Sequence, residues 1–106
     1  HLHQHPELGF QEQHTSGVIA RELADMGLAP HTGIGRTGVV AVVSGTMGHS
    51  DRAVALRADM DALPIAEENN LDHTSKFPGR MHGCGHDGHV AMLLASGGTG
   101  FLAMSC

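Results

Sequence analysis

The chain has 106 residues, which is enough for one domain or for part of a larger one. Hydrophobic residues make up 41% of the sequence, so the composition is that of a folded globular protein and excludes a disordered one. The formal net charge is −5 with only six Lys plus Arg, which excludes a basic surface for nucleic acid or anionic membranes. No apolar run is near the roughly 20 residues of a membrane-spanning helix.

The first predicted element is a helix over residues 7–27. Ile19, Leu23 and Met26 recur at the spacing of one helix face, and Gly27 is a typical helix end. A loop punctuated by glycines is expected to follow this helix. The helix face that carries Ile19, Leu23 and Met26 should pack against a core.

Two short strands are predicted after that loop. Residues 38–43 (GVVAVV) are continuously apolar and mostly β-branched, which is typical of a strand buried on both faces. Residues 44–52 are polar and form a turn, and residues 53–58 (AVALRA) form the second strand. Because this connection is too short for a parallel crossover, the two strands are expected to pair as an antiparallel hairpin.

A long loop is predicted from Asp59 onwards, and a helix follows over His89–Ser96. The order of helix, strand, strand, loop and helix predicts an α/β fold. The glycine-rich stretch of residues 95–101 (ASGGTGF) should break the last helix, because each glycine inside a helix costs roughly 1 kcal/mol relative to alanine.

The glycine-rich segment 81–89 (MHGCGHDGH) carries the strongest functional signal. It offers thiolate, imidazole and carboxylate groups, which are the usual ligands of zinc and similar divalent ions. In an extended segment alternate side chains point the same way, so Cys84 and His86 can bind one ion together. The segment predicts a metal site, although one loop cannot supply a whole one.

Two carboxylates form the second functional element. Asp59 and Asp61 follow the predicted strand 53–58, where catalytic groups of α/β proteins gather. One of them could orient a ligating histidine. The alternative is a strand-end turn in which the carboxylates only cap the backbone.

Most other polar side chains are expected on the surface without a functional role. Glu67 and Glu68 are expected to be solvated loop charges, and Cys106 a terminal free thiol. The histidines expected on the surface are His14, His31, His49 and His73. His1, His3 and His5 are expected to be ordinary surface residues too, and the alternative is a frayed N-terminal end that scavenges metal.

Three segments, in order and in approximate spacing, resemble one protein family. They are residues 2–12 (LHQHPELGFQE), 55–65 (ALRADMDALPI) and 81–89. The chain is similar to the dinuclear-metal amidohydrolases that include hippurate hydrolase, N-acyl-amino-acid amidohydrolases and plant auxin-conjugate hydrolases. The resemblance implies that residues 1–106 are the N-terminal portion of a zinc-peptidase-like catalytic domain without the family's lid and dimerisation domain. It also implies a parent protein that forms a homodimer. The two cysteines are too few for a disulfide scaffold, which favours a reducing, cytoplasmic setting.

The resemblance assigns roles to particular residues. Cys84 and His86 would ligate a pair of divalent ions, with manganese or zinc the first choices and cobalt or nickel also suited. Asp61 would support the active-site geometry. The remaining ligands (a Glu and two His) and the general base (another Glu) would lie beyond residue 106, and Gly83 stands where alanine is commoner. The residues expected around the ligands are Asp59, His82, Asp87 and His89.

The activity implied is metal-assisted hydrolysis of the amide bond of an N-acyl amino acid. Without the general base, the chain alone is expected to be inactive. One alternative is a non-catalytic metal-binding fragment, because two ligands hold an ion loosely. The other is a cysteine hydrolase in which Cys84 is the nucleophile and His82 or His86 its base.

Overall fold

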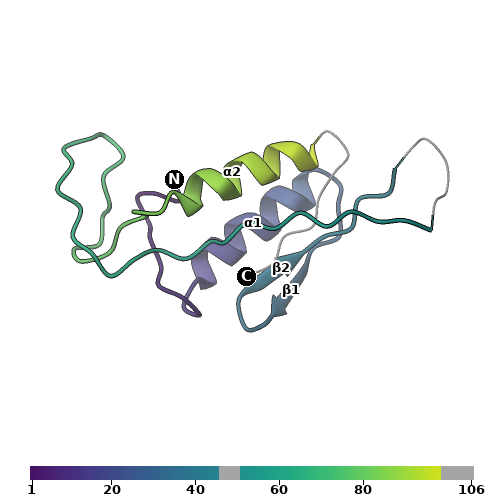
Figure 1. Cartoon of the computed structure of the whole chain (residues 1–106), viewed down its shortest axis with the longest axis horizontal. Coiled ribbons are helices and arrows are strands. Elements are labelled where there is room, and N and C mark those ends of the chain that lie inside the picture. The colour runs from purple at the N-terminus through teal and green to yellow at the C-terminus, as the bar shows by residue number, and fades with distance from the viewer. Residues whose placement is uncertain (46–50, 99–106) are drawn as a thin grey trace.

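A computed structural model of the chain describes residues 1–45 and 51–98 (Figure 1). Two helices lie side by side, and a two-stranded antiparallel sheet packs against the first of them. This is the expected α/β arrangement of two helices and a strand pair. Neither helix in the described ranges is long and apolar enough to cross a lipid bilayer. The elements in chain order are α1 (Gln13–Asp25), β1 (His31–Ile34), β2 (Gly38–Val40) and α2 (His86–Gly97).

Helix α1 begins at Gln13, so the prediction that it starts at residue 7 is wrong. The carboxylate of Glu7 instead accepts hydrogen bonds from the backbone N–H groups of His14 (3.0 Å) and Thr15 (2.7 Å). These N–H groups lie in the first turn and have no partner inside the helix. Glu7 therefore caps the helix from outside it, where its negative charge also faces the positive end of the helix dipole.

The predicted apolar face of α1 is only partly confirmed. Ile19 and Leu23 are fully buried, as expected. Met26 is 39% exposed, because the helix ends at Asp25 and Met26 no longer lies on its inner face.

The predicted strand pairing is wrong. Strand β2 pairs with β1, with His31 opposite Val40 and Thr32 opposite Val39, and residues 53–58 form no strand. The chain reverses within a tight turn in which Gly35 and Arg36 both have positive φ (57° and 94°). A hairpin this local costs less loop-closure entropy than pairing with a distant segment. Residues 46–50 of the expected intervening turn lie outside the described residues.

Strand β1 gave no signal in the sequence because every residue in it is exposed. Strand assignment from sequence depends on apolar alternation, which a strand exposed on both faces does not show. Strand β2 is shorter than expected, and beyond it the side chain of Val42 is exposed while Ala41 is buried. The run 38–43 is therefore not a strand buried on both faces.

The hydrophobic core lies between the two helices, β2 and the extended segment around Met60. Each helix and the extended segment contribute two apolar side chains, and β2 together with the residue that follows it contributes another two. The core therefore joins segments that are far apart in the sequence. The buried members are Ile19, Leu23, Val39, Ala41, Ala58, Met60, Val90 and Leu93.

Helix α2 begins at His86, three residues before the predicted start, and continues to Gly97. Gly85 precedes it with φ of 76°, a left-handed conformation that side chains other than glycine rarely adopt. The helix can begin earlier than expected because Gly85 turns the chain directly into it. Residues 99–106, including Cys106, lie outside the described residues.

A buried hydrogen bond joins the start of α1 to the hairpin. The Thr37 hydroxyl donates to the carboxylate of Glu12 over 2.7 Å, and both residues are buried. Thr37→Val keeps the shape but leaves that carboxylate without this donor, so we expect the free energy of unfolding to fall by about 1–3 kcal/mol. Urea denaturation would measure the loss. Thr32→Val, at an exposed position of β1, is the matched control, and an equal loss in both variants would contradict the prediction.

Candidate metal centre

The segment that carries the two aspartates is held between two distant parts of the chain. The Ala62 N–H donates to the Glu7 carbonyl over 2.7 Å. Leu63 and Met81 exchange two backbone hydrogen bonds of 2.9 and 3.1 Å. These contacts place Asp61 beside the glycine-rich segment 81–89, which begins at Met81.

Asp61 contacts the first residue of α2. The Nδ1 atom of His86 lies 2.9 Å from the Asp61 carboxylate and 3.0 Å from the Asp61 main-chain oxygen. Both partners are acceptors, so the ring proton belongs on Nδ1. This leaves Nε2 as the ring atom with a lone pair for a metal, the arrangement usual for ligating histidines.

Asp59 has a different partner. Its carboxylate forms an ion pair with the Arg57 guanidinium, so Asp61 rather than Asp59 contacts His86. Both carboxylates are more than one-third exposed. Asp59 and Asp61 are two residues apart in the sequence, but in the structure they contact different partners.

Cys84 is exposed and lies two residues before His86 on the turn that Gly85 makes into α2. A thiol and an imidazole are a donor pair that suits zinc and similar ions, so these residues fit a divalent metal. Within residues 1–45 and 51–98, no third His, Cys, Asp or Glu completes a close set with them. The described residues thus offer two candidate ligands at this place and no third.

His82 lies buried near the beginning of the glycine-rich segment 81–89. It is 4% exposed, and neither ring nitrogen has a hydrogen-bond partner among the described residues. Burial lowers the pKa of His82, which favours the neutral ring at this position. The segment is therefore buried at His82 and exposed at Cys84.

His3, near the N-terminus, contacts Asp87 in the glycine-rich segment 81–89. The prediction that His3 is an ordinary surface residue is therefore wrong. Its Nδ1 lies 2.8 Å from the Asp87 carboxylate and its Nε2 lies 3.0 Å from the Glu67 carboxylate. Side-chain exposure is only 19% for His3, 18% for Asp87 and 2% for Glu67. Glu67 is consequently not a solvated loop charge either.

Charge stabilises this bridge. The hydrogen bond to Glu67 raises the pKa of His3, with Asp87 adding to the effect against the opposing influence of burial. The pKa of Glu67 is lowered to about 2, first by the Ser75 N–H at 2.6 Å and then by His3. Burial opposes ionisation of Asp87, but its hydrogen bonds to His3 and the Gly88 N–H leave its pKa lowered. These directions favour the protonated form of His3 between two ionised carboxylates.

His89 is the last of the predicted site residues. It is exposed one turn after His86, and their ring centroids are 5.8 Å apart. It therefore flanks the His86 ring rather than contacting Asp61.

A cleft of about 410 Å³ adjoins the Asp61–His86 contact. Phe10 lies on its wall with φ of 64°, and the Arg36 guanidinium, from a residue that also has positive φ, is stacked 5.4 Å from the Phe10 ring centroid. Such strained backbone is concentrated at functional sites. Sequence reasoning missed both residues because no local pattern marks a positive φ outside glycine.

The glycines beside Cys84 should respond differently to alanine. At Gly83 a Cβ would lie 2.8 Å from Cδ1 of Ile65, the mobile end of a half-exposed side chain, so we expect a change below about 1 kcal/mol. At Gly85 the left-handed backbone should make alanine cost about 1–2 kcal/mol. Thermal denaturation of both variants tests this difference, and a larger loss at Gly83 would contradict it.

Comparison with known proteins finds relatives of this chain among peptidases and amidohydrolases. Residues 55–98 match the sequence model of peptidase family M20/M25/M40. The chain is 50% identical over 97 residues to an N-acyl-L-amino acid amidohydrolase of Geobacillus stearothermophilus, covering 91% of this chain and 25% of that protein. It is 48% identical over 93 residues to the hippurate hydrolase of Campylobacter jejuni, covering 88% of this chain and 24% of that protein.

A solved structure shows the same fold. The YxeP protein of Bacillus subtilis, described as a dinuclear metal binding peptidase from the M20 family, matches with a TM-score of 0.88 and 37% identity. The match covers 98% of this chain and 31% of that one. The chain is therefore similar in sequence and in fold to the M20 family of peptidases and amidohydrolases. It spans about a quarter of the length of the curated relatives that it matches.

Proposed function

We propose that this chain contributes Cys84 and His86 to the dinuclear metal site of an amidohydrolase that acts on N-acyl amino acids. The observation that supports the proposal most is the hydrogen bond from His86 Nδ1 to Asp61, which orients the ring for ligation through Nε2. The relatives named above supply the substrate class, because they include hydrolases of hippurate and of N-acyl-L-amino acids.

Each residue has a distinct task in this proposal. A divalent metal pair, manganese or zinc by preference, would polarise the amide carbonyl and activate water near neutral pH. Cys84 serves as a thiolate ligand, and Asp61 holds the His86 ring in place. His3 fixes Asp87, the residue after His86, and so restrains the start of α2. The cleft beside His86 is where the substrate binds.

The general base is not assigned to any residue of this chain. Glu67 is engaged with His3 and Ser75, so it is not available to move a proton from water to the leaving amine. We accordingly propose that residues 1–106 form part of a catalytic domain and are inactive alone. We further propose that the parent protein is a homodimer. We place it in the cytoplasm, because a reducing compartment keeps the Cys84 thiol available as a ligand.

Hydrolysis of N-benzoylglycine tests the proposal at two levels. The 106-residue chain should show no turnover with added manganese or zinc. The full-length protein that contains it should hydrolyse the substrate, lose activity with a chelator and regain it with metal. Metal-dependent turnover by the chain alone would contradict its proposed inactivity. A full-length protein that is insensitive to chelators would contradict the metal mechanism.

The structure does not favour the cysteine hydrolase alternative. Among the described residues Cys84 makes no hydrogen bond to a histidine, and His86 Nδ1 already has Asp61 as its partner. A nucleophilic cysteine requires such a base within hydrogen-bond reach. Alkylation combined with chelation separates the two mechanisms, since a cysteine hydrolase would withstand the chelator.

A further inference from the structure

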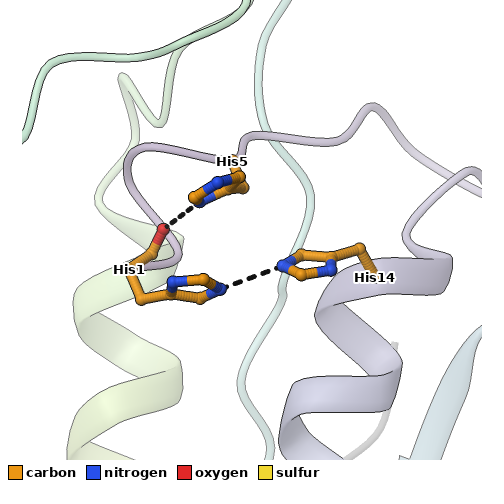
Figure 2. A group of neighbouring side chains, drawn as sticks. All are labelled: His1, His5 and His14. Atoms are coloured by element: carbon orange, nitrogen blue, oxygen red, sulfur yellow. Dashed lines mark hydrogen bonds between the residues drawn. The ribbon is translucent and has the colours of Figure 1, made fainter.

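Three histidines converge at the junction of the N-terminal loop with α1, apart from the residues of the proposed catalytic site. Figure 2 shows the rings of His1, His5 and His14 facing one another. One ring nitrogen from each lies within 4.8 Å of the others. In the part of the chain that the structure describes, this is the one group of three metal-ligating side chains so close together.

The rings are already oriented for ligation. Nδ1 of His5 lies 2.9 Å from the His1 carbonyl oxygen, so it donates its proton there and leaves Nε2 with a lone pair. The Nε2 atoms of His1 and His14 share a hydrogen bond of 3.0 Å, so an ion bound by both atoms would take the place of the proton between them (Figure 2). An N–H donated to a backbone carbonyl is the usual way in which a protein orients a metal-binding histidine.

The backbone that carries the three rings is also fixed. His14 is in the first turn of α1, where its N–H is held by the Glu7 carboxylate. The loop of residues 1–5 is closed by hydrogen bonds from Gln4 N–H to the His1 carbonyl and from His5 N–H to the Leu2 carbonyl. Ligands spread over a loop and a helix therefore meet without rearrangement of either segment.

We propose that His1, His5 and His14 form a separate divalent metal site, which takes zinc or a similar borderline ion. Three imidazoles with water as the fourth ligand are a donor set that zinc accepts in tetrahedral geometry. This site has no residue in common with the proposed catalytic metal site. The proposal therefore does not depend on Cys84 and His86 being metal ligands.

The bound ion would tie the N-terminal loop to α1. The same loop presents His3 to Asp87 and Glu67, and its Gln4 carbonyl accepts the Lys76 N–H over 2.9 Å. Metal at the three-histidine site would thus stiffen the loop that holds the start of α2 in place. A binding free energy of this kind adds to the stability of the folded state.

Zinc titration of the full chain in a Cys84→Ser background tests the site, because that change removes the thiolate ligand of the catalytic pair. Isothermal titration calorimetry should show one equivalent bound. Adding His14→Ala, or His5→Ala as a second variant, should weaken zinc binding by at least about tenfold. His31→Ala, at an exposed position of β1, is the matched control and should leave the affinity unchanged.

Cobalt gives a readout that separates the two sites. Cobalt bound by Cys84 shows a thiolate charge-transfer band, whereas cobalt bound by three imidazoles shows only ligand-field absorption. His14→Ala in the chain that retains Cys84 should reduce the ligand-field absorption and leave the thiolate charge-transfer band unchanged. The proposal is overturned if the Cys84→Ser chain binds no zinc, or if His14→Ala binds zinc as tightly as its parent while circular dichroism shows both folded.

Discussion

Asp61→Ala is expected to weaken metal binding by Cys84 and His86 by about 10- to 100-fold, the usual effect of removing the partner that orients a ligating histidine. The Asp61 carboxylate accepts the His86 Nδ1 proton over 2.9 Å, and its loss frees the ring to rotate. The main-chain oxygen of residue 61, at 3.0 Å, remains as an acceptor, so we expect the lower part of this range. In a Cys106→Ser background, which removes the other thiol, the thiolate charge-transfer band of cobalt measures the affinity at Cys84 alone.

Asp59→Ala is the matched control for that experiment. It removes a carboxylate two residues away, of similar exposure, whose partner is Arg57 rather than His86. Cobalt affinity should stay within about twofold of the unchanged chain. Equal losses in the two variants would mean that general negative charge, and not orientation of His86, supports the metal.

His3→Ala is expected to lower the melting temperature by several degrees and to change how stability depends on pH. His3 has a raised pKa in the folded state, so its contribution is complete below its ordinary value of 6.5 and is lost as pH rises through the raised value. Glu67 has its pKa lowered from 4.5 to about 2, so its contribution is complete above 4.5 and is lost as pH falls towards 2. The unchanged chain should be most stable between these limits.

The two limbs of that profile should respond differently to His3→Ala. The loss of stability above pH 6.5 should disappear, because it belongs to His3. The loss at acid pH should persist in part, because the Ser75 N–H is the first cause of the lowered Glu67 pKa and remains. Circular dichroism melts from about pH 3 to pH 8 would show both limbs.

His73→Ala is the control for the pH experiment. The His73 ring contacts the His3 ring at 5.3 Å between centroids, but the carboxylates hydrogen-bonded to His3 are those of Asp87 and Glu67. We expect its melting profile to keep both limbs. A profile for His3→Ala that matches that of His73→Ala would contradict a role for the two carboxylates.

The residue pattern predicted the α/β class and the principal inward face of α1, and the resemblance of three segments to a known family predicted the family. These depend on short-range information: Ile19 and Leu23 are one helical turn apart, and Cys84 and His86 lie two residues apart in one segment. Periodicity and motif spacing express such local relations directly. The roles of Cys84, His86 and Asp61 remain predictions that the metal-binding experiments above will test.

Contacts between distant segments were decided by the tertiary structure. Strand β2 could pair either with residues 53–58 or with an exposed strand of no apolar pattern, and the tight Gly35–Arg36 turn selected the latter. Asp59 and Asp61 are equivalent in sequence, yet only Asp61 faces His86 once Leu63 is paired with Met81.

The histidines show the same division between local and distant information. His3 and Asp87 are 84 residues apart, and His1 and His14 are 13 apart, so no local spacing links either pair. Taken one at a time, these histidines look like ordinary polar residues of a protein surface. Their contacts exist because backbone pairing of distant segments and the start of α1 bring them together, which residue periodicity does not encode.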